Sequence, residues 1–132
     1  GHVIPSLMTK FNNATEDTVT CWGDGTPTRE FMYVDDLADA CLFAIENYSD
    51  AELINVGSGQ DVSIFHLAHK VKDLVGYQGR IEWDTNRPNG TPKRPLDYSK
   101  ITEKGWTPKY DLDAGLKKTY EWFQQATNIQ TK

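Results

Sequence analysis

The sequence predicts an α/β domain. Stretches with apolar residues at helical spacing alternate with short runs of β-branched residues, a pattern typical of helices packed on short strands. The clearest helical stripe falls within 64–75, and the clearest β pattern falls within 18–22. At 132 residues the chain has the length of one domain and can bury a core. We therefore expect one unit over 1–132, with a short mixed sheet and flanking helices.

The composition and charge of the chain argue against several classes of protein. The net charge of −5 and the lack of a dominant basic face argue against general nucleic-acid binding. No apolar run is long enough to cross a bilayer, and we expect no secretory leader. Cys21 and Cys41 fall in a predicted strand and a predicted helix, and match neither a metal site nor a disulfide framework. Buried free thiols fit a reducing compartment, so we expect a cytoplasmic protein.

The first segment predicts a helix. Apolar residues recur at helical spacing over 4–11, and Pro5 is tolerated in a first helical turn. His2 then lies at or just before the helix start, with Lys10 two turns further along. By themselves, both are interpreted as solvated side chains. A polar loop follows, and then the strand at 18–22.

The next stretch combines a tight turn with a basic side chain. Gly23 and Gly25 can adopt the positive φ angles that such a turn requires. Arg29 then leads into a second predicted strand, whose buried residues are Phe31 and Val34. A guanidinium at the mouth of a sheet suits a phosphate or carboxylate ligand. A surface pair with an aspartate explains Arg29 equally well.

A second helix is predicted to begin with Asp35 or Asp36 as its N-cap. Capping and the helix dipole account for both aspartates, so neither is interpreted as catalytic. The apolar face of this helix comprises Leu37, Cys41, Ala44, Ile45 and Tyr48.

A third strand is predicted over 52–56, followed by Gly57-Ser58-Gly59. This order invites comparison with a dinucleotide fingerprint, but Val62 stands where the third glycine belongs. The next helix also starts too late, near Ser63, so no cofactor-binding residue is assigned.

The helix within 64–75 is closed by Gly76 as a C-cap. His66 and His69 lie on its polar side without an acidic or cysteine partner at ligand spacing. We therefore expect no metal site. A strand over 80–84 follows.

The loop at 85–95 gathers cations in an otherwise acidic chain. It holds three prolines, one glycine, Arg87, Lys93 and Arg94. Prolines stiffen a loop and reduce the entropy that it loses on binding. Clustered cations on a stiff loop suit a pyrophosphate, and a plain solvated loop is the alternative.

Two helices complete the chain. A short one is expected over 97–104, and a last one begins with Asp111 or Asp113 as its cap. Residues 127–132 are expected to fray. The apolar face of the last helix comprises Leu112, Leu116, Tyr120 and Phe123.

The stretch Trp-Gly-Asp-Gly-Thr-Pro-Thr-Arg-Glu-Phe-Met-Tyr-Val-Asp-Asp at 22–36 resembles a signature of extended short-chain dehydrogenases/reductases that act on nucleotide sugars. Four more stretches fall in the order of that family: His-Val-Ile-Pro at 2–5, Ile-Asn-Val-Gly-Ser-Gly at 54–59, Pro-Asn-Gly-Thr-Pro-Lys-Arg-Pro-Leu-Asp at 88–97 and Gly-Leu-Lys-Lys-Thr-Tyr-Glu-Trp-Phe at 115–123. Within it, the chain is most similar to the GDP-L-fucose synthase family of bifunctional 3,5-epimerases/4-reductases. It looks like the C-terminal, substrate-binding portion of such an enzyme.

The resemblance implies a fold that is only partly present. In the family, an N-terminal Rossmann half holds NADP, and that half is absent here, as is any Tyr-x-x-x-Lys pair. The segments 36–48 and 53–57 would complete the Rossmann layer, so the isolated chain should expose apolar surface there. The complete enzyme would be a homodimer that converts GDP-4-keto-6-deoxy-D-mannose to GDP-L-fucose, and the fragment alone would be inactive.

The resemblance also implies roles for single residues. His2 would be the general acid of the epimerisation, while Arg29 and Arg94 would bind the diphosphate. Lys10, where the family has arginine, is a further candidate for the diphosphate. Trp22 would pack against the nucleotide sugar, or would merely plug the strand end.

Two other functions remain open. Another nucleotide-sugar epimerase or dehydratase shares the Arg-x-Phe-x-x-Val-Asp-Asp stretch but should lack His-Val-x-Pro upstream. A non-catalytic nucleotide-sugar-binding module would fit the missing Tyr-x-x-x-Lys. An upstream glycine-rich loop and Tyr-x-x-x-Lys in the complete reading frame would favour the enzyme.

Overall fold

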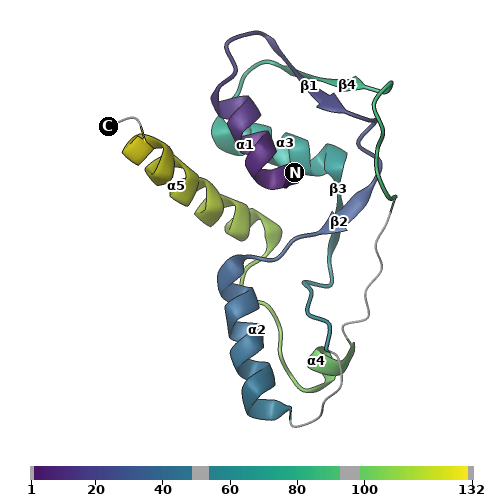
Figure 1. Ribbon diagram of the computed structural model, residues 1–132, viewed down its shortest axis with the longest axis vertical. Helices are drawn as coiled ribbons and strands as arrows, with labels where there is room; N and C mark the ends of the chain where they lie inside the picture. The colour runs from purple at the N-terminus through teal and green to yellow at the C-terminus, as the bar shows by residue number, and fades with distance from the viewer. Residues whose placement is uncertain (1, 49–53, 93–98, 131–132) are drawn as a thin grey trace.

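The computed structural model describes residues 2–48, 54–92 and 99–130, and it has the α/β architecture that the sequence predicts (Figure 1). Helices alternate with short strands along the chain. Their bounds are α1 Val3–Asn12, β1 Thr18–Trp22, β2 Thr28–Glu30, α2 Val34–Asn47, β3 Asp61–Ser63, α3 Ile64–Val75, β4 Arg80–Asp84, α4 Ser99–Glu103 and α5 Leu112–Gln130. No helix in the described ranges has both the length and the hydropathy needed to cross a membrane.

The strands form two small sheets. β1 pairs with β4 in parallel, with Thr18 opposite Arg80 and Trp22 opposite Asp84. β2 pairs with β3 in the antiparallel sense, with Thr28 opposite Ser63. Parallel and antiparallel pairing thus occur in separate sheets, whereas the sequence predicted one mixed sheet. Two-stranded sheets are marginal alone, so their stability depends on the helices packed against them.

The larger core lies between α1, α3 and the β1–β4 pair, in the upper part of Figure 1. Apolar residues three and four apart face inward on both helices, as the predicted stripes require. Ser63 caps α3 by accepting the His66 amide at 3.0 Å, and Gly76 ends the helix at φ 84°. The buried residues of this core are Leu7, Met8, Phe11, Val19, Cys21, Leu67, Ala68, Val71 and Leu116.

A smaller core joins α2 to α4 in the lower part of Figure 1 and comprises Ala40, Ile101 and Trp106. Hydrogen bonds reinforce it. The Asp36 carboxylate is 1% exposed and accepts the backbone amides of Lys109 and Tyr110 at 2.9 and 3.0 Å. The Trp106 Nε1–H donates to Asp39 at 2.9 Å. Two aspartates of α2 therefore bind the segment that leads into α5.

The start of α2 differs from the prediction. The helix begins at Val34, and Tyr33 is its N-cap without a side-chain cap. Neither Asp35 nor Asp36 is the cap, because the amides of Asp36 and Leu37 already bond to the Tyr33 carbonyl. The predicted second strand is present as β2, but it ends at Glu30, so Phe31 and Val34 lie outside it, and Val34 is 65% exposed.

Other local predictions also differ from the structure. The described part of the predicted strand 52–56 forms no strand, and 52–53 lie outside the described residues. Ile54 and Val56 instead pack half-buried against the smaller core. Cys41 is exposed, unlike buried Cys21. Residues 127–130 continue α5 in place of the predicted fraying.

Candidate functional site

The turn after β1 requires its glycines. Gly23 and Gly25 have φ of 85° and 80°, the positive values that the sequence predicts. A Cβ added to Gly25 would lie 2.7 Å from the Cβ of Phe65, and one added to Gly23 would clash with Asn89. The turn therefore packs tightly against the chain around it, with Trp22 before it and Arg29 after it.

The loop after β4 is attached to this turn along its length. The Gly23 amide donates to the Asp84 carbonyl at 2.9 Å, and the Asp24 amide donates to Asn89 Oδ1 at 2.7 Å. The Thr28 amide donates to the Pro92 carbonyl at 2.9 Å. The turn and the described part of the predicted cationic loop therefore form one unit, here called the turn–loop unit (22–29 and 84–92).

Arg29 lies at one end of this unit and is half-buried. Its Nη1 donates to the Thr28 carbonyl at 2.7 Å, and its Nη2 lies 3.7 Å from where a Cβ on Gly90 would stand. No carboxylate in the described ranges forms a salt bridge with Arg29, so the alternative of a surface ion pair finds no support there. The remaining guanidinium donors can serve an anion.

Trp22 lies at the other end and is 60% exposed. In the described residues the ring is therefore not buried over the end of the strand. The Arg87 guanidinium carbon lies 4.9 Å from the centre of the ring, and Arg87 Nε lies 3.6 Å from an Asp84 carboxylate oxygen. An exposed indole beside a cation offers a stacking surface for a ligand.

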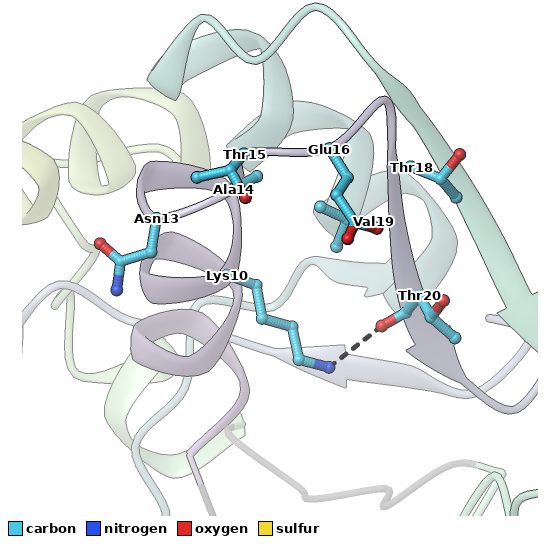
Figure 2. A pocket seen from close by; sticks show the side chains of 8 residues that line it. All are labelled: Lys10, Asn13, Ala14, Thr15, Glu16, Thr18, Val19 and Thr20. Carbon is cyan, nitrogen blue, oxygen red and sulfur yellow. Dashed lines mark hydrogen bonds between the residues drawn. The ribbon is translucent and has the colours of Figure 1, made fainter.

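Lys10 extends from α1 across to β1. Its Nζ donates to the Thr20 carbonyl at 3.2 Å, as Figure 2 shows. It lines an open hollow of about 320 Å³ together with 13–16 and 18–20. Burial raises the pKa of the Cys21 thiol, and the nearby Lys10 charge offsets part of that rise. Lys10 is thus engaged with β1 two residues before Trp22.

The remaining candidates are less tied to the turn–loop unit. His2 is exposed just before α1, and its side chain makes no capping bond. Arg94 lies outside the described residues. The structure therefore joins Trp22 and Arg29 through one loop, and no contact in the described ranges joins His2 to them.

Sequence reasoning missed Asn89 and Asp84, which hold the loop to the turn. The Asn89-Gly90 dipeptide was a usable signal for a turn, and Gly90 does have φ 83°. Asp84 gave no such signal, because its role depends on the pairing of β4 with β1.

A second concave surface of about 600 Å³ lies between 58–62 and 108–113. Lys70 bridges to Asp113 beside it at 2.7 Å. The surface is lined by polar and charged groups of both signs, so its chemistry favours no particular ligand.

The described residues offer little for a metal or a dinucleotide. No group of three or more His, Cys, Asp or Glu side chains in these ranges could hold a metal ion. Gly57 and Gly59 are followed by β3 before α3 begins, and 54–56 form no strand ahead of them. This arrangement does not fit the strand–glycine turn–helix that receives the pyrophosphate of NADP.

Comparison with known proteins agrees with the fold and the turn sequence. A model of the NAD dependent epimerase/dehydratase family matches residues 1–57. The chain is 49% identical over 125 residues to GDP-L-fucose synthase 1 of Arabidopsis thaliana, covering 92% of this chain and 39% of that protein. It is 41% identical over 134 residues to the GDP-L-fucose synthase of Escherichia coli K12, covering 92% of this chain and 42% of that protein.

A solved structure extends the likeness. The NADP-bound GDP-L-fucose synthetase of Naegleria fowleri matches with a TM-score of 0.88 at 28% identity, over 97% of this chain and 41% of that one. The chain thus spans about two fifths of the length of the curated relatives it matches. The chain is therefore homologous to part of the GDP-L-fucose synthases over most of its length, and its first 57 residues match the NAD dependent epimerase/dehydratase family model.

Proposed function

We propose that this chain is the C-terminal, sugar-nucleotide-binding domain of an NADPH-dependent 3,5-epimerase/4-reductase that converts GDP-4-keto-6-deoxy-D-mannose to GDP-L-fucose. The turn–loop unit is the observation that carries the proposal. It presents an exposed indole at one end and a guanidinium without a described ion pair at the other. An aromatic face suits the nucleotide sugar, and a planar fork of donors suits its diphosphate.

The diphosphate would be held mainly by Arg29 and Arg94, with Lys10 as a further contact. Arg29 has one donor engaged with the Thr28 carbonyl, a bond that orients the guanidinium while its other donors remain for oxygen atoms of the ligand. The loop that leads toward Arg94 is attached to the turn at Asn89 and Pro92. An attached loop loses less entropy when it closes on a ligand.

His2 would be the general acid of the epimerisation. A base on one face of the sugar removes the proton next to the C4 ketone, and His2 delivers a proton to the same carbon from the opposite face. The side chain must then regain a proton from solvent, and its exposure permits this. Histidine suits the duty because its unperturbed pKa is about 6.5. The opposing base would come from another part of the protein.

The nicotinamide cofactor would likewise be held elsewhere. It supplies the hydride for the 4-reduction, and the described residues lack the turn that would bind its pyrophosphate. The complete enzyme would be a cytoplasmic homodimer.

The test is an affinity measurement on the complete protein with the Arg29→Ala variant. We expect GDP-mannose binding, measured by calorimetry, to weaken by about 1.5–3 kcal/mol, the range for hydrogen bonds to charged groups. Arg29→Lys should recover only part, because it lacks the planar fork. Lys118→Ala, which removes an exposed charge on α5, is the matched control and should bind normally.

Unchanged affinity in Arg29→Ala would mean that Arg29 does not bind the diphosphate. Tighter binding of UDP-glucose than of GDP-mannose would favour a UDP-sugar epimerase or dehydratase. Nucleotide-sugar binding without any turnover by the complete protein would favour a non-catalytic module.

A further inference from the structure

We propose that Arg87 is a positioning residue for Trp22: it holds the indole ring in the orientation in which the exposed part of the ring receives the nucleotide portion of the ligand. The inference rests on the proposed function, because that function makes Trp22 a binding surface. It gives a role to Arg87, to which the proposed function assigns none.

The backbone positions of Arg87 and Trp22 are both fixed by Asp84. Asp84 lies opposite Trp22 in the parallel β1–β4 pair, and its carbonyl accepts the Gly23 amide at 2.9 Å. The same carbonyl accepts the Arg87 amide at 3.1 Å, and the Asp84 carboxylate accepts the Asn86 amide at 3.1 Å. One residue therefore fixes both the end of the strand and the turn that returns toward it.

The side chains then meet across that turn. The Arg87 guanidinium carbon lies 4.9 Å from the centre of the Trp22 ring, within the range of a cation–π interaction. The Asp84 carboxylate lies 3.6 Å from Arg87 Nε and also restrains the guanidinium. Asp84, Arg87 and Trp22 thus form a series in which each side chain limits the freedom of the next.

This series matters because burial restrains the Trp22 side chain only in part. A side chain that is 60% exposed at the end of a strand can adopt several staggered rotamers. Contact with Arg87 favours one of them before the ligand arrives, so less conformational entropy is lost on binding. Arg87 would act through the ring and not by touching the ligand.

The first test is a double-mutant cycle on the complete protein, with GDP as the probe and calorimetry as the readout. We expect Arg87→Ala to weaken GDP binding by about two- to fivefold, the equivalent of an exposed cation–π pair. Arg87→Lys should recover most of this, since a lysine cation can also lie over the ring. In the Trp22→Ala background, Arg87→Ala should have no further effect. An equal loss in both backgrounds would mean that Arg87 contacts the ligand directly, and the proposal would be overturned.

The second test does not depend on the function. The difference in fluorescence between the protein and its Trp22→Phe variant isolates the emission of Trp22. Arg87→Ala should increase quenching of that component by acrylamide, whereas Arg87→Lys should not. Arg80→Ala, which removes an exposed cation from the other end of β4, is the control and should leave it unchanged. Unaltered quenching in Arg87→Ala would overturn the proposal. If the parent protein binds no GDP-sugar, the proposed function fails, and this measurement still decides whether Arg87 holds the ring.

Discussion

The two cores of this molecule are stabilised in different ways. The core between α1, α3 and the β1–β4 pair buries apolar side chains from α1, β1, α3 and α5, and Met8, Leu67 and Val71 are fully buried in it. The core between α2 and α4 buries Ala40, Ile101 and Trp106 and adds the hydrogen bonds of Asp36 and Asp39. The first core depends mainly on apolar packing, and the second combines a few buried apolar side chains with hydrogen bonds.

The difference is clearest on α2. Its predicted apolar face was expected to be exposed in the isolated chain, and this is confirmed: Leu37 is 48% exposed and Ile45 is 77% exposed. Val34 and Leu42 are exposed as well. An amphipathic helix with an uncovered apolar face indicates a surface for another part of a protein. Because the chain spans about two fifths of its relatives, the remaining part of a longer protein is the occupant that the predictions below assume.

The largest expected difference is between the isolated chain and the complete protein. If the part of the protein that covers α2 also binds the cofactor, the chain alone should neither bind NADPH tightly nor reduce a 4-keto sugar nucleotide. NADPH oxidation, followed by absorbance with GDP-4-keto-6-deoxy-D-mannose present, measures this. Oxidation that depends on the keto sugar in the pure chain would contradict the prediction and make the uncovered face irrelevant to activity.

His2 is exposed and makes no capping bond, so replacing it should affect catalysis and not the stability of the fold. His2→Gln in the complete protein should bind GDP-sugar normally, reduce the keto sugar slowly and lose inversion, with a rate loss of about 10²–10⁴, typical of a missing general acid. Deuterium incorporation from heavy water at C3 and C5 of the product, followed by NMR, is the readout. Full deuterium incorporation with normal inversion would mean that His2 is not the general acid but only a solvated residue at the start of α1.

A matched pair of truncations compares the two cores directly. Leu67→Ala should cost about 2–5 kcal/mol of unfolding free energy, because Leu67 is fully buried and a cavity remains. Ile45→Ala in the isolated chain should stay within about 0.5 kcal/mol, as surface changes do. Urea denaturation measures both.

The same pair can show whether α2 becomes covered. In the complete protein, Ile45→Ala should cost about 2 kcal/mol or more, as for a buried isoleucine. An equally small cost in both forms would mean that the face of α2 stays in solvent.

The last prediction concerns the hydrogen bonds of the second core. Asp36→Ala leaves the amides of Lys109 and Tyr110 without an acceptor, at a cost of about 1–3 kcal/mol for each group that stays unsatisfied. Amide hydrogen exchange at these two residues should speed up as well. Asp35→Ala, an exposed neighbour, should change neither quantity. Unchanged exchange in Asp36→Ala would mean that the smaller core needs no such bonds.

Much of this protein could be predicted from local signals in the sequence. The bounds of α3 follow from an apolar stripe, a Ser63 cap and a Gly76 stop, all within the helix or directly at its ends. The turn at Gly23 and Gly25 follows from the freedom of glycine at positive φ. Asp111 was one of two residues proposed as the cap of the last helix, and its carboxylate does accept the Ala114 amide at 2.8 Å. Such signals act through backbone sterics and short hydrogen bonds, which do not require the rest of the fold.

Tertiary structure decided what depends on residues far apart in the chain. Asp36 resembled a helix cap, but its carboxylate binds the backbone of Lys109 and Tyr110. In the sequence, Arg87 is one of three cations in a loop, and only the pairing of β1 with β4 brings it over the Trp22 ring. Residues 54–56 have the composition of a strand, but among the described residues no strand pairs with them. Hydrogen bonds and ring contacts between distant segments form only after the cores have packed, so no pattern of neighbouring residues encodes them.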